Sequence, residues 1–147
     1  MHDSSTEPDD PLPAFNLLLH RAARTADTLI ERALADVQIT ARQYTLLEAI
    51  AHHPDSSQAK ISAATAIDRA TLADISGRLR RLGLVERLDA PFDRREKILR
   101  LTDAGASRLE LARQRVASIE EAMISCIPLE QRDNLLDGLA RISDISP

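Results

Sequence analysis

The chain has 147 residues, of which 44% are hydrophobic, 29% charged and 2% aromatic, so its size suits one compact domain and its composition favours helices. The single cysteine excludes an intramolecular disulfide and a cysteine-based zinc site, and we expect a cytoplasmic protein. No stretch approaches the roughly 18 consecutive apolar residues of a membrane span, and we expect no membrane partner.

Charge is unevenly distributed along the chain. The formal net charge is −4, which argues against indiscriminate binding to nucleic acid, yet residues 68–100 carry nine basic and six acidic side chains. That segment is therefore +3 and the remaining residues together are −7. This asymmetry fits one face for a polyanion, whereas the alternative is that the arginines only solvate helix faces, and charge alone does not decide between them.

The first half of the chain predicts three helices. Residues 1–13 carry four acidic residues and three prolines without the basic and apolar regions of a signal peptide, so we expect a disordered acidic arm. Apolar residues recur with a period near 3.6 over residues 14–35, which predicts an amphipathic helix. Thr40 followed by Gln43 has capping-box spacing and opens a second helix to about His52. A loop then leads to a short helix that stops near Thr65.

The second half predicts a capped helix, a hairpin and two further helices. Asp68 caps a helix that runs to Leu82, and Gly83 stands where a left-handed residue ends it. Residues 84–88 and 97–101 are short apolar-rich runs that predict two strands joined by a protruding loop. Thr102 then opens a long helix to about residue 126, and Pro128 starts a last helix that ends near residue 142.

This order of elements is that of a winged helix-turn-helix. We therefore predict a mainly α fold with a small β-hairpin wing, in which residues 36–102 bind DNA and residues 14–35 and 103–147 form a helical dimerisation region. The terminal helices carry more apolar side chains than one small winged domain can bury, which favours a two-fold symmetric homodimer. These side chains are Phe15, Leu18, Leu19, Ile119, Ile124, Ile127, Leu135, Leu136, Leu139 and Ile142.

The face of the 68–82 helix opposite its apolar stripe consists largely of small side chains, with Gly77 among them. A mid-helix glycine costs about 1 kcal/mol relative to alanine, and close approach to a major groove would explain it. The alternative is that Gly77 packs under a neighbouring helix. The hairpin tip offers adjacent guanidinium groups for phosphates or a narrow minor groove, unless it forms only an ordinary surface ion pair. The predicted DNA contacts are Arg69, Ala70, Thr71, Asp74, Arg78, Arg81, Asp93, Arg94 and Arg95.

Four segments together carry a resemblance to a known family. They are residues 67–72 (IDRATL), 78–87 (RLRRLGLVER), 93–95 (DRR) and 101–105 (LTDAG). At these spacings the chain resembles the core of the multiple antibiotic resistance regulator (MarR) family. The resemblance implies a homodimeric transcriptional regulator, as a rule a repressor, that binds a pseudo-palindromic double-stranded DNA operator. At Asp74 and Gly77, where family members often carry longer polar or basic side chains, this chain departs from the pattern, so the operator sequence stays open.

The resemblance also implies release from DNA by a small molecule: an aromatic acid, a phenol or an aromatic coenzyme A thioester. The pocket would lie between the first helix and the winged region, near Leu72, with arginines that meet a carboxylate or phosphates. Each of these arginines is alternatively a solvated helix residue. The predicted ligand contacts are Leu19, His20, Ala23, Arg24, Arg42 and Ile50.

Other functions are less well supported by the sequence. Cys126 would make a redox sensor, but it lies in an apolar string that favours an inert, buried thiol. Adjacent His52 and His53 lack the i, i+4 spacing of a helical metal site, and we predict no metal and no cofactor. We find no glycine-rich phosphate loop or nucleophile elbow, so we do not expect an enzyme. A winged-helix module that grips an acidic protein is the remaining alternative.

Overall fold

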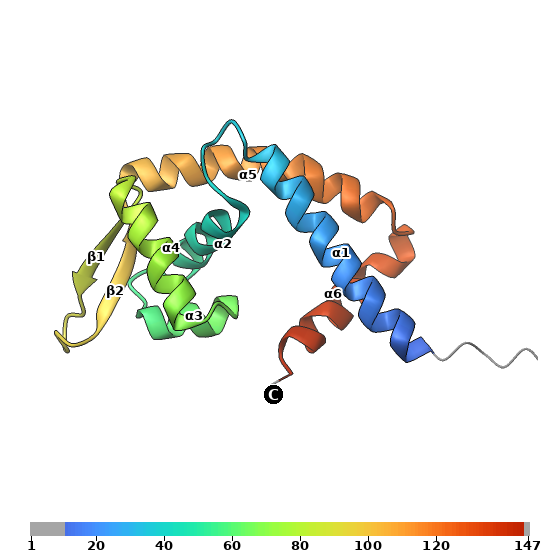
Figure 1. Cartoon of the computed structure of the whole chain (residues 1–147), viewed down its shortest axis with the longest axis horizontal. Helices are drawn as coiled ribbons and strands as arrows, with labels where there is room; N and C mark the ends of the chain where they lie inside the picture. Colours follow the sequence, from blue (N-terminus) through green and yellow to red (C-terminus); the bar gives the residue numbers. More distant parts are fainter. Residues whose placement is uncertain (1–10, 146–147) are drawn as a thin grey trace, which may run out of the picture.

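The structure, a computed structural model, describes residues 11–145 as an elongated molecule with a winged region at one end and a helical arm at the other (Figure 1). A two-stranded antiparallel hairpin lies at the outer end of the winged region. The elements are α1 (Pro11–Ala33), α2 (Ala41–His52), α3 (Gln58–Thr65), α4 (Arg69–Arg81), β1 (Val85–Asp89), β2 (Lys97–Leu101), α5 (Asp103–Ser125) and α6 (Leu129–Ser143).

The first helix begins earlier than predicted. Helix α1 starts at Pro11, so the last three residues of the expected disordered arm are helical. Proline is tolerated in the first turn because the N–H groups there have no intrahelical partner, which is why Pro11 and Pro13 do not delay the start. Residues 1–10 of that arm lie outside the described residues.

The caps of the helix-turn-helix are as predicted. Thr40 and Gln43 form a reciprocal capping box at the start of α2, and Asp68 accepts a hydrogen bond from Thr71 N at the start of α4. Ser57 caps α3 in the same way through Lys60 N. Side-chain oxygens satisfy N–H groups that the helix leaves free, and these caps fix where each helix begins.

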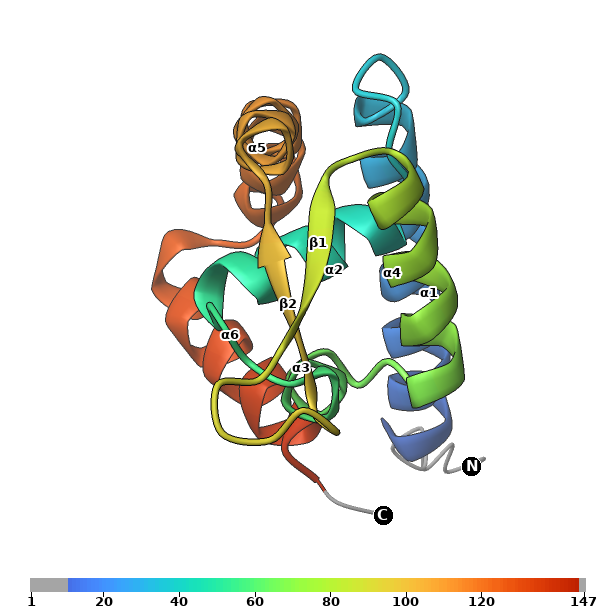
Figure 2. The same ribbon diagram turned by 90° about the vertical axis from the view of Figure 1, so that its left-hand side faces the viewer.

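The predicted hairpin forms with a shift of one residue in β1. Leu84 N donates to Leu79 O at 2.9 Å and so belongs to the end of α4, where Gly83 has a φ of 71°. The register pairs Arg87 with Leu99 and Asp89 with Lys97. Directly paired residues share one face of a hairpin, so these four side chains lie on the same face. Figure 2 shows the hairpin beside α3 and α4.

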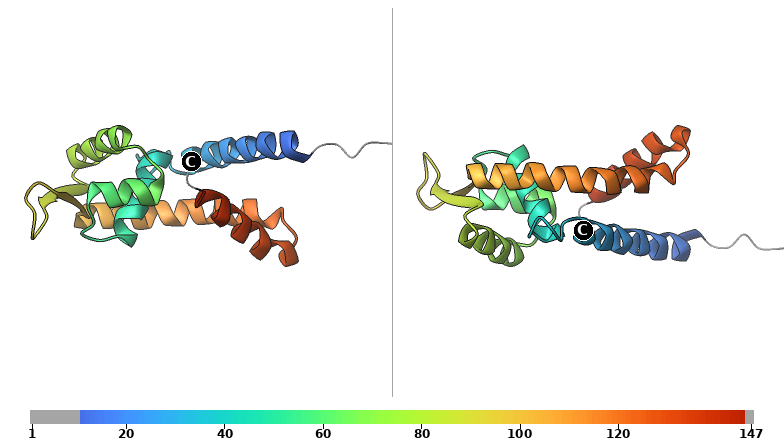
Figure 3. Two further views of the ribbon diagram at one scale, coloured as in Figure 1. Left: turned by 90° about the horizontal axis from the view of Figure 1, so that it is seen from below. Right: turned by 90° about the horizontal axis from the view of Figure 1, so that it is seen from above.

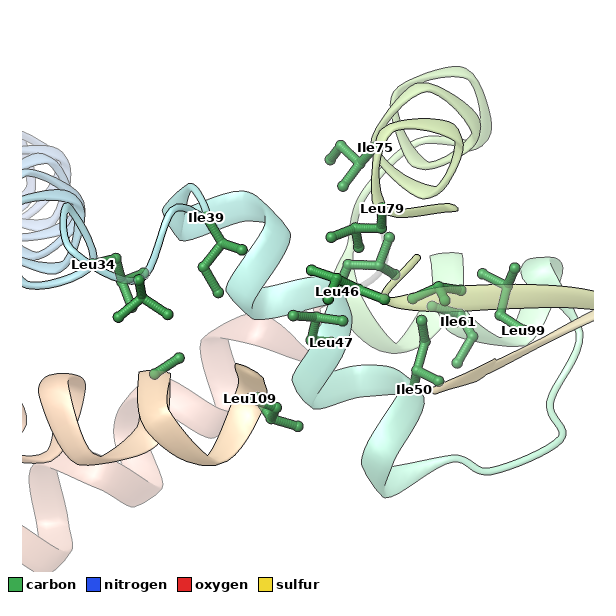
Figure 4. Packing of buried hydrophobic residues seen from close by; sticks show 14 of the residues in the cluster. Leu34, Ile39, Leu46, Leu47, Ile50, Ile61, Ile75, Leu79, Leu99 and Leu109 are labelled. Atoms are coloured by element: carbon green, nitrogen blue, oxygen red, sulfur yellow. The ribbon is translucent and has the colours of Figure 1, made fainter. Parts of the chain in front are cut away.

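The hydrophobic core lies around α2 (Figure 4). Leu46, Leu47 and Ile50 of α2 are at most 1% exposed and are surrounded by apolar side chains of α3, α4 and β2. In the first half of α5, Leu109, Ala112 and Val116 follow one another at intervals of about one turn and belong to this core. Residues 34–116 therefore bury a continuous core within one chain.

The helical arm consists of α1, the second half of α5 and α6, and it buries far less of its side-chain surface than the winged region does. No residue of α6 is buried, and α6 stands apart from α1 in both views of Figure 3. Among residues 11–145, no helix is long and apolar enough to cross a bilayer. Many large apolar side chains of the arm are exposed: Phe15, Leu17, Leu18, Leu129, Leu135, Leu136, Leu139, Ile142 and Ile145.

Candidate nucleic-acid interface

Helix α4 presents an uncovered outer face. Its inner residues Leu72, Ile75 and Leu79 are at most 6% exposed, whereas Ala70, Ala73 and the charged residues of the opposite side are exposed. A Cβ built on Gly77 would meet only Arg81 Nη1, at 3.9 Å, among the described atoms. The alternative that Gly77 packs under a neighbouring helix is therefore wrong for this chain. The outer face of α4 is open to a partner that approaches closely.

Polar contacts order the side chains at the start and middle of α4. Thr71 Oγ1 donates to Asp68 Oδ2 at 2.6 Å, and this hydrogen bond is the main reason that the pKa of Asp68 lies below its usual value. One turn further on, Arg78 Nη2 lies 3.2 Å from Asp74 Oδ2, with both side chains about 60% exposed. The acid at position 74 therefore orients a guanidinium on the outer face of the helix.

Hydrogen bonds to Asp93 order the hairpin tip. Asp93 Oδ1 accepts from Arg95 N at 2.9 Å, and Glu96 N donates to Asp93 O at 3.0 Å. The carboxylate of Asp93 thus orders the turn, and within residues 11–145 it forms no ion pair with Arg94 or Arg95. Both guanidinium groups are exposed and free to contact a polyanion.

The structure brings the start of α4 and the hairpin together. Arg69 and Arg95, both predicted as DNA contacts, line one cleft of about 250 Å³. Arg87 and Lys97 line it too, although the sequence analysis did not select them. Their shared strand face follows from the pairing register, which needs both strand ends to be known.

A second and larger cavity, of about 600 Å³, lies between α1, α2, α4 and α5; we call it the main cavity. Of the six predicted ligand contacts it contains only Arg42. Four carboxylates and two guanidinium groups line it: Asp27, Glu31, Asp74, Glu120, Arg42 and Arg78. Glu31 Oε1 accepts from Ala41 N at 3.0 Å, so that carboxylate caps α2.

The other predicted ligand contacts lie elsewhere. His20, Ala23 and Arg24 line a separate, shallow depression along α1, and Leu19 is half-buried on the same helix without lining the main cavity. Ile50 is 1% exposed within the core, as is Leu72. Periodicity indicates which residues face inward but not which element they face, and this is why the predicted set is dispersed.

Tyr44 in the wall of the main cavity was missed by the sequence analysis and belongs to a polar network. Arg113 donates to both carboxylate oxygens of Glu48, at 2.8 and 2.9 Å, and the negative charge of Glu48 also acts on Tyr44. The Arg113 hydrogen bond lowers the pKa of Glu48, while burial raises the pKa of Tyr44. This network fixes one wall of the cavity to α5.

Cys126 is exposed at the end of α5, so the interpretation of a buried, inert thiol is wrong for the single chain. It borders a shallow apolar groove with Leu18 and Met123. Among the described residues, no three His, Cys, Asp or Glu side chains gather as a metal site.

An uncovered, small-faced helix beside an arginine-tipped hairpin defines a winged helix-turn-helix transcriptional regulator. The chain belongs to the MarR family, whose sequence profile matches residues 37–96. It is 31% identical over 137 residues to the HTH-type transcriptional repressor NicR of Pseudomonas putida, covering 93% of this chain and 87% of that one.

Solved structures show the same fold. The repressor CouR bound to a 23-mer DNA duplex has a TM-score of 0.83 at 30% identity and covers 95% of this chain and 99% of its own. The apo form of MarR from Escherichia coli has a TM-score of 0.74 at 25% identity and covers 86% of this chain and 95% of its own.

Proposed function

We propose that this regulator is a repressor that binds a pseudo-palindromic operator as a homodimer and is released by a small aromatic effector. The observation that carries the proposal is the uncovered outer face of α4. Small residues there let the backbone of a helix approach base edges, and Thr71, Asp74 and Arg78 supply polar groups that can read them. The arginine tip of the hairpin would enter the adjacent minor groove. The repressor CouR, which has the same fold, is solved bound to a 23-mer DNA duplex, and this supports DNA binding by this chain.

The arm supplies the reason for a dimer. Large apolar side chains on both α1 and α6 are exposed, and exposed apolar side chains that gather on one part of a molecule are typical of an interface with another protein. A two-fold axis through the arm would place two copies of α4 in successive major grooves, about 34 Å apart.

Nuclease protection tests the operator proposal, with overlapping duplexes that cover the promoter regions beside the gene that encodes this protein. We expect one protected site with two half-sites about ten base pairs apart. Thr71→Ala should change which half-site sequence is preferred, and Arg95→Ala should weaken binding to every duplex. Equal losses from both variants on all sequences would contradict the base-reading role of α4.

The main cavity is the proposed effector site. Its volume lies within the range of about 300–1,000 Å³ that small-molecule sites occupy, and Arg42 offers a guanidinium to a carboxylate or phenolate. Thr71, Asp74 and Arg78 of α4 line the same cavity, so an occupant would touch the helix that reads DNA. Structures of the same fold, at 24% identity, include CouR from Rhodococcus jostii RHA1 bound to p-coumaroyl-CoA and BpsR from Bordetella bronchiseptica, regulated by 6-hydroxynicotinic acid.

Calorimetric titration with benzoate, 4-hydroxybenzoate, 6-hydroxynicotinate and p-coumaroyl-CoA tests the effector class. We expect at least one to bind and to raise the dissociation constant for the protected duplex. Arg42→Gln should weaken that ligand, while Arg24→Gln, in the separate depression on α1, should leave it unchanged. If Arg24→Gln loses effector binding and Arg42→Gln keeps it, the main cavity is excluded as the effector site.

A further inference from the structure

We propose that the cleft between α3, the start of α4 and the hairpin holds one phosphate group of the DNA backbone. We call it the cationic cleft, and this inference rests on the proposed DNA-binding function. Four cationic side chains reach it, from α4, from both strands of the hairpin and from the loop that joins the strands. The cationic side chains are Arg69, Arg87, Arg95 and Lys97, and the lining is completed by Ser57, Gln58, Ala59, Leu72 and Glu96.

The hairpin register places two of these cations. Arg87 is paired with Leu99, and Lys97 is paired with Asp89, so Arg87 and Lys97 are diagonal neighbours on one face of the sheet. Leu99, on the same face, is fully buried against the core. The face that anchors the hairpin therefore also carries Arg87 and Lys97, which line the cleft beside α3 and α4.

The helices close the other side of the cleft. Arg69 is the first residue of α4, and Gln58 and Ala59 are the first two residues of α3. The N–H groups of a first helical turn have no intrahelical partner and favour an anion. The cleft thus combines side-chain cations with backbone donors, which is the donor set of a phosphate site.

Most of the positive charge in the cleft is uncompensated. Within residues 11–145, Arg69, Arg87 and Arg95 form no ion pair with a carboxylate, and only Lys97 is paired, with Asp89. Glu96 is the single acid in the lining. Three unpaired guanidinium groups around about 250 Å³ repel one another, and a phosphate would remove that repulsion.

The position of the cleft selects a backbone phosphate over other anions. It lies between the helix proposed for the major groove and the tip proposed for the minor groove, and the phosphate chain of a duplex separates those two grooves. Arg69, one of the predicted DNA contacts, would then hold the backbone. Its replacement would weaken all sequences alike.

Fluorescence anisotropy with a labelled duplex of about 30 base pairs and mixed sequence tests the proposal over roughly 50–300 mM salt. Phosphate contacts are independent of sequence, so the operator need not be known. The variants are Arg87→Gln and Lys97→Gln, with Arg100→Gln as the matched control. Arg100 lies on the opposite face of β2 and pairs with Asp55 and Glu86.

Log affinity falls as log salt rises, and we expect Arg87→Gln and Lys97→Gln each to make this slope about 0.9 less steep. The loss of affinity between 0.1 M and 1 M salt would then be about eightfold smaller than in the wild type. Arg87→Lys should retain the slope, because it retains the charge. Arg100→Gln should change neither quantity. Circular dichroism of each variant verifies that the fold is intact.

Three outcomes would overturn the proposal. If folded Arg87→Gln and Lys97→Gln keep the salt slope of the wild type, and the wild type binds the duplex, the cleft is excluded as a phosphate site. The proposed DNA-binding function would not be affected by that result. An equal loss in Arg100→Gln would show a general charge effect in place of a site. A wild type that binds no duplex at 50 mM salt, a condition that favours phosphate contacts, would instead remove the DNA-binding function itself.

Discussion

The winged region and the arm differ in how much of their apolar surface one chain can cover. The winged region buries Leu46, Leu47 and Leu99 almost completely, while α6 of the arm has no buried residue and leaves Leu136 55% exposed. Amphipathic helices occur in both regions, α4 in the winged region and α1 and α6 in the arm, so an apolar helix face does not by itself explain the difference. The difference teaches that the winged region can bury its core within one chain, and it supports the proposal that the arm is one half of a dimer interface.

The close contact between the start of α5 and the end of α4 offers the largest expected effect. A Cβ on Gly105, near the start of α5, would stand 1.9 Å from Leu84 O. The main chain cannot yield there, since Thr102 N and Thr102 Oγ1 hold Leu84 O and Gly83 O at 3.1 and 2.6 Å. Gly105→Ala should lower the free energy of unfolding by about 4 kcal/mol, measured by urea denaturation.

Gly138→Ala is the matched control for this prediction, because no atom lies within 4 Å of a Cβ at that position of α6. It should leave stability unchanged or raise it by up to about 1 kcal/mol. Equal stability of Gly105→Ala and the wild type would show that α5 does not pack against Leu84 at this close distance.

The next effect concerns the uncovered face of the arm. Leu139 lies in the stripe of exposed apolar residues on α6, and a lysine there would place a charge in the expected dimer interface. Leu139→Lys should raise the dimer dissociation constant at least about 30-fold, which corresponds to about 2 kcal/mol. Analytical ultracentrifugation measures it.

Asn134→Lys adds the same charge to α6 about 130° away from the centre of that stripe and serves as its control. It should leave the dimer intact. A wild-type protein that sediments as a monomer at micromolar concentration would refute the interpretation of the arm as half of an interface.

A smaller effect comes from the Glu48–Arg113 pair, which fixes α5 to the winged region. The folded-state pKa of Glu48 lies below its ordinary value of 4.5, so its stabilisation is present above that pH and is lost as pH falls through the folded pKa. Glu48→Gln should therefore lower the free energy of unfolding by about 1 kcal/mol at pH 7, reduced because Arg113 is partly exposed, and by less near pH 3.

Glu110→Gln controls for the loss of one carboxylate near Arg113. Glu110 lies 3.8 Å from Arg113 and is 62% exposed, so its removal should have no measurable effect. A difference between Glu48→Gln and the wild type that does not shrink toward acid pH would show that the ion pair is not its cause.

The smallest expected effect separates stability from function. A Cβ on Gly77 would make only an ordinary contact, 3.9 Å from Arg81 Nη1, so Gly77→Ala should stabilise the protein by about 0.5–1 kcal/mol in thermal unfolding. The added methyl group faces the proposed groove, and binding of the protected duplex should weaken. Stronger stability with unchanged DNA affinity would show that the outer face of α4 does not meet the duplex closely.

Much of the winged region could be predicted from sequence because its signals are local. The caps at Thr40 and Asp68 and the left-handed Gly83 act within a few residues of themselves, and all three are as expected. The start of α1 was placed too late, because prolines suggest a break even where the first turn accepts them.

The grouping of charges and the exposure of side chains depended on contacts between distant segments. Ile50 was expected in a pocket and lies in the core, and Cys126 was expected to be buried and is exposed. Arg42 lines the main cavity together with residues of α1 and α4, and these residues come together only because the chain folds around α2.

The sequence by itself determined the order of the helices, the hairpin and the small outer face of α4, since hydrogen bonds within one turn and apolar periodicity specify these features. Only the tertiary structure decided that Arg69, Arg87, Arg95 and Lys97 share one cleft and that Gly77 is uncovered. Such proximities depend on strand register and on helix packing. Residues far apart in the chain contribute to both, and neither leaves a pattern within any single segment.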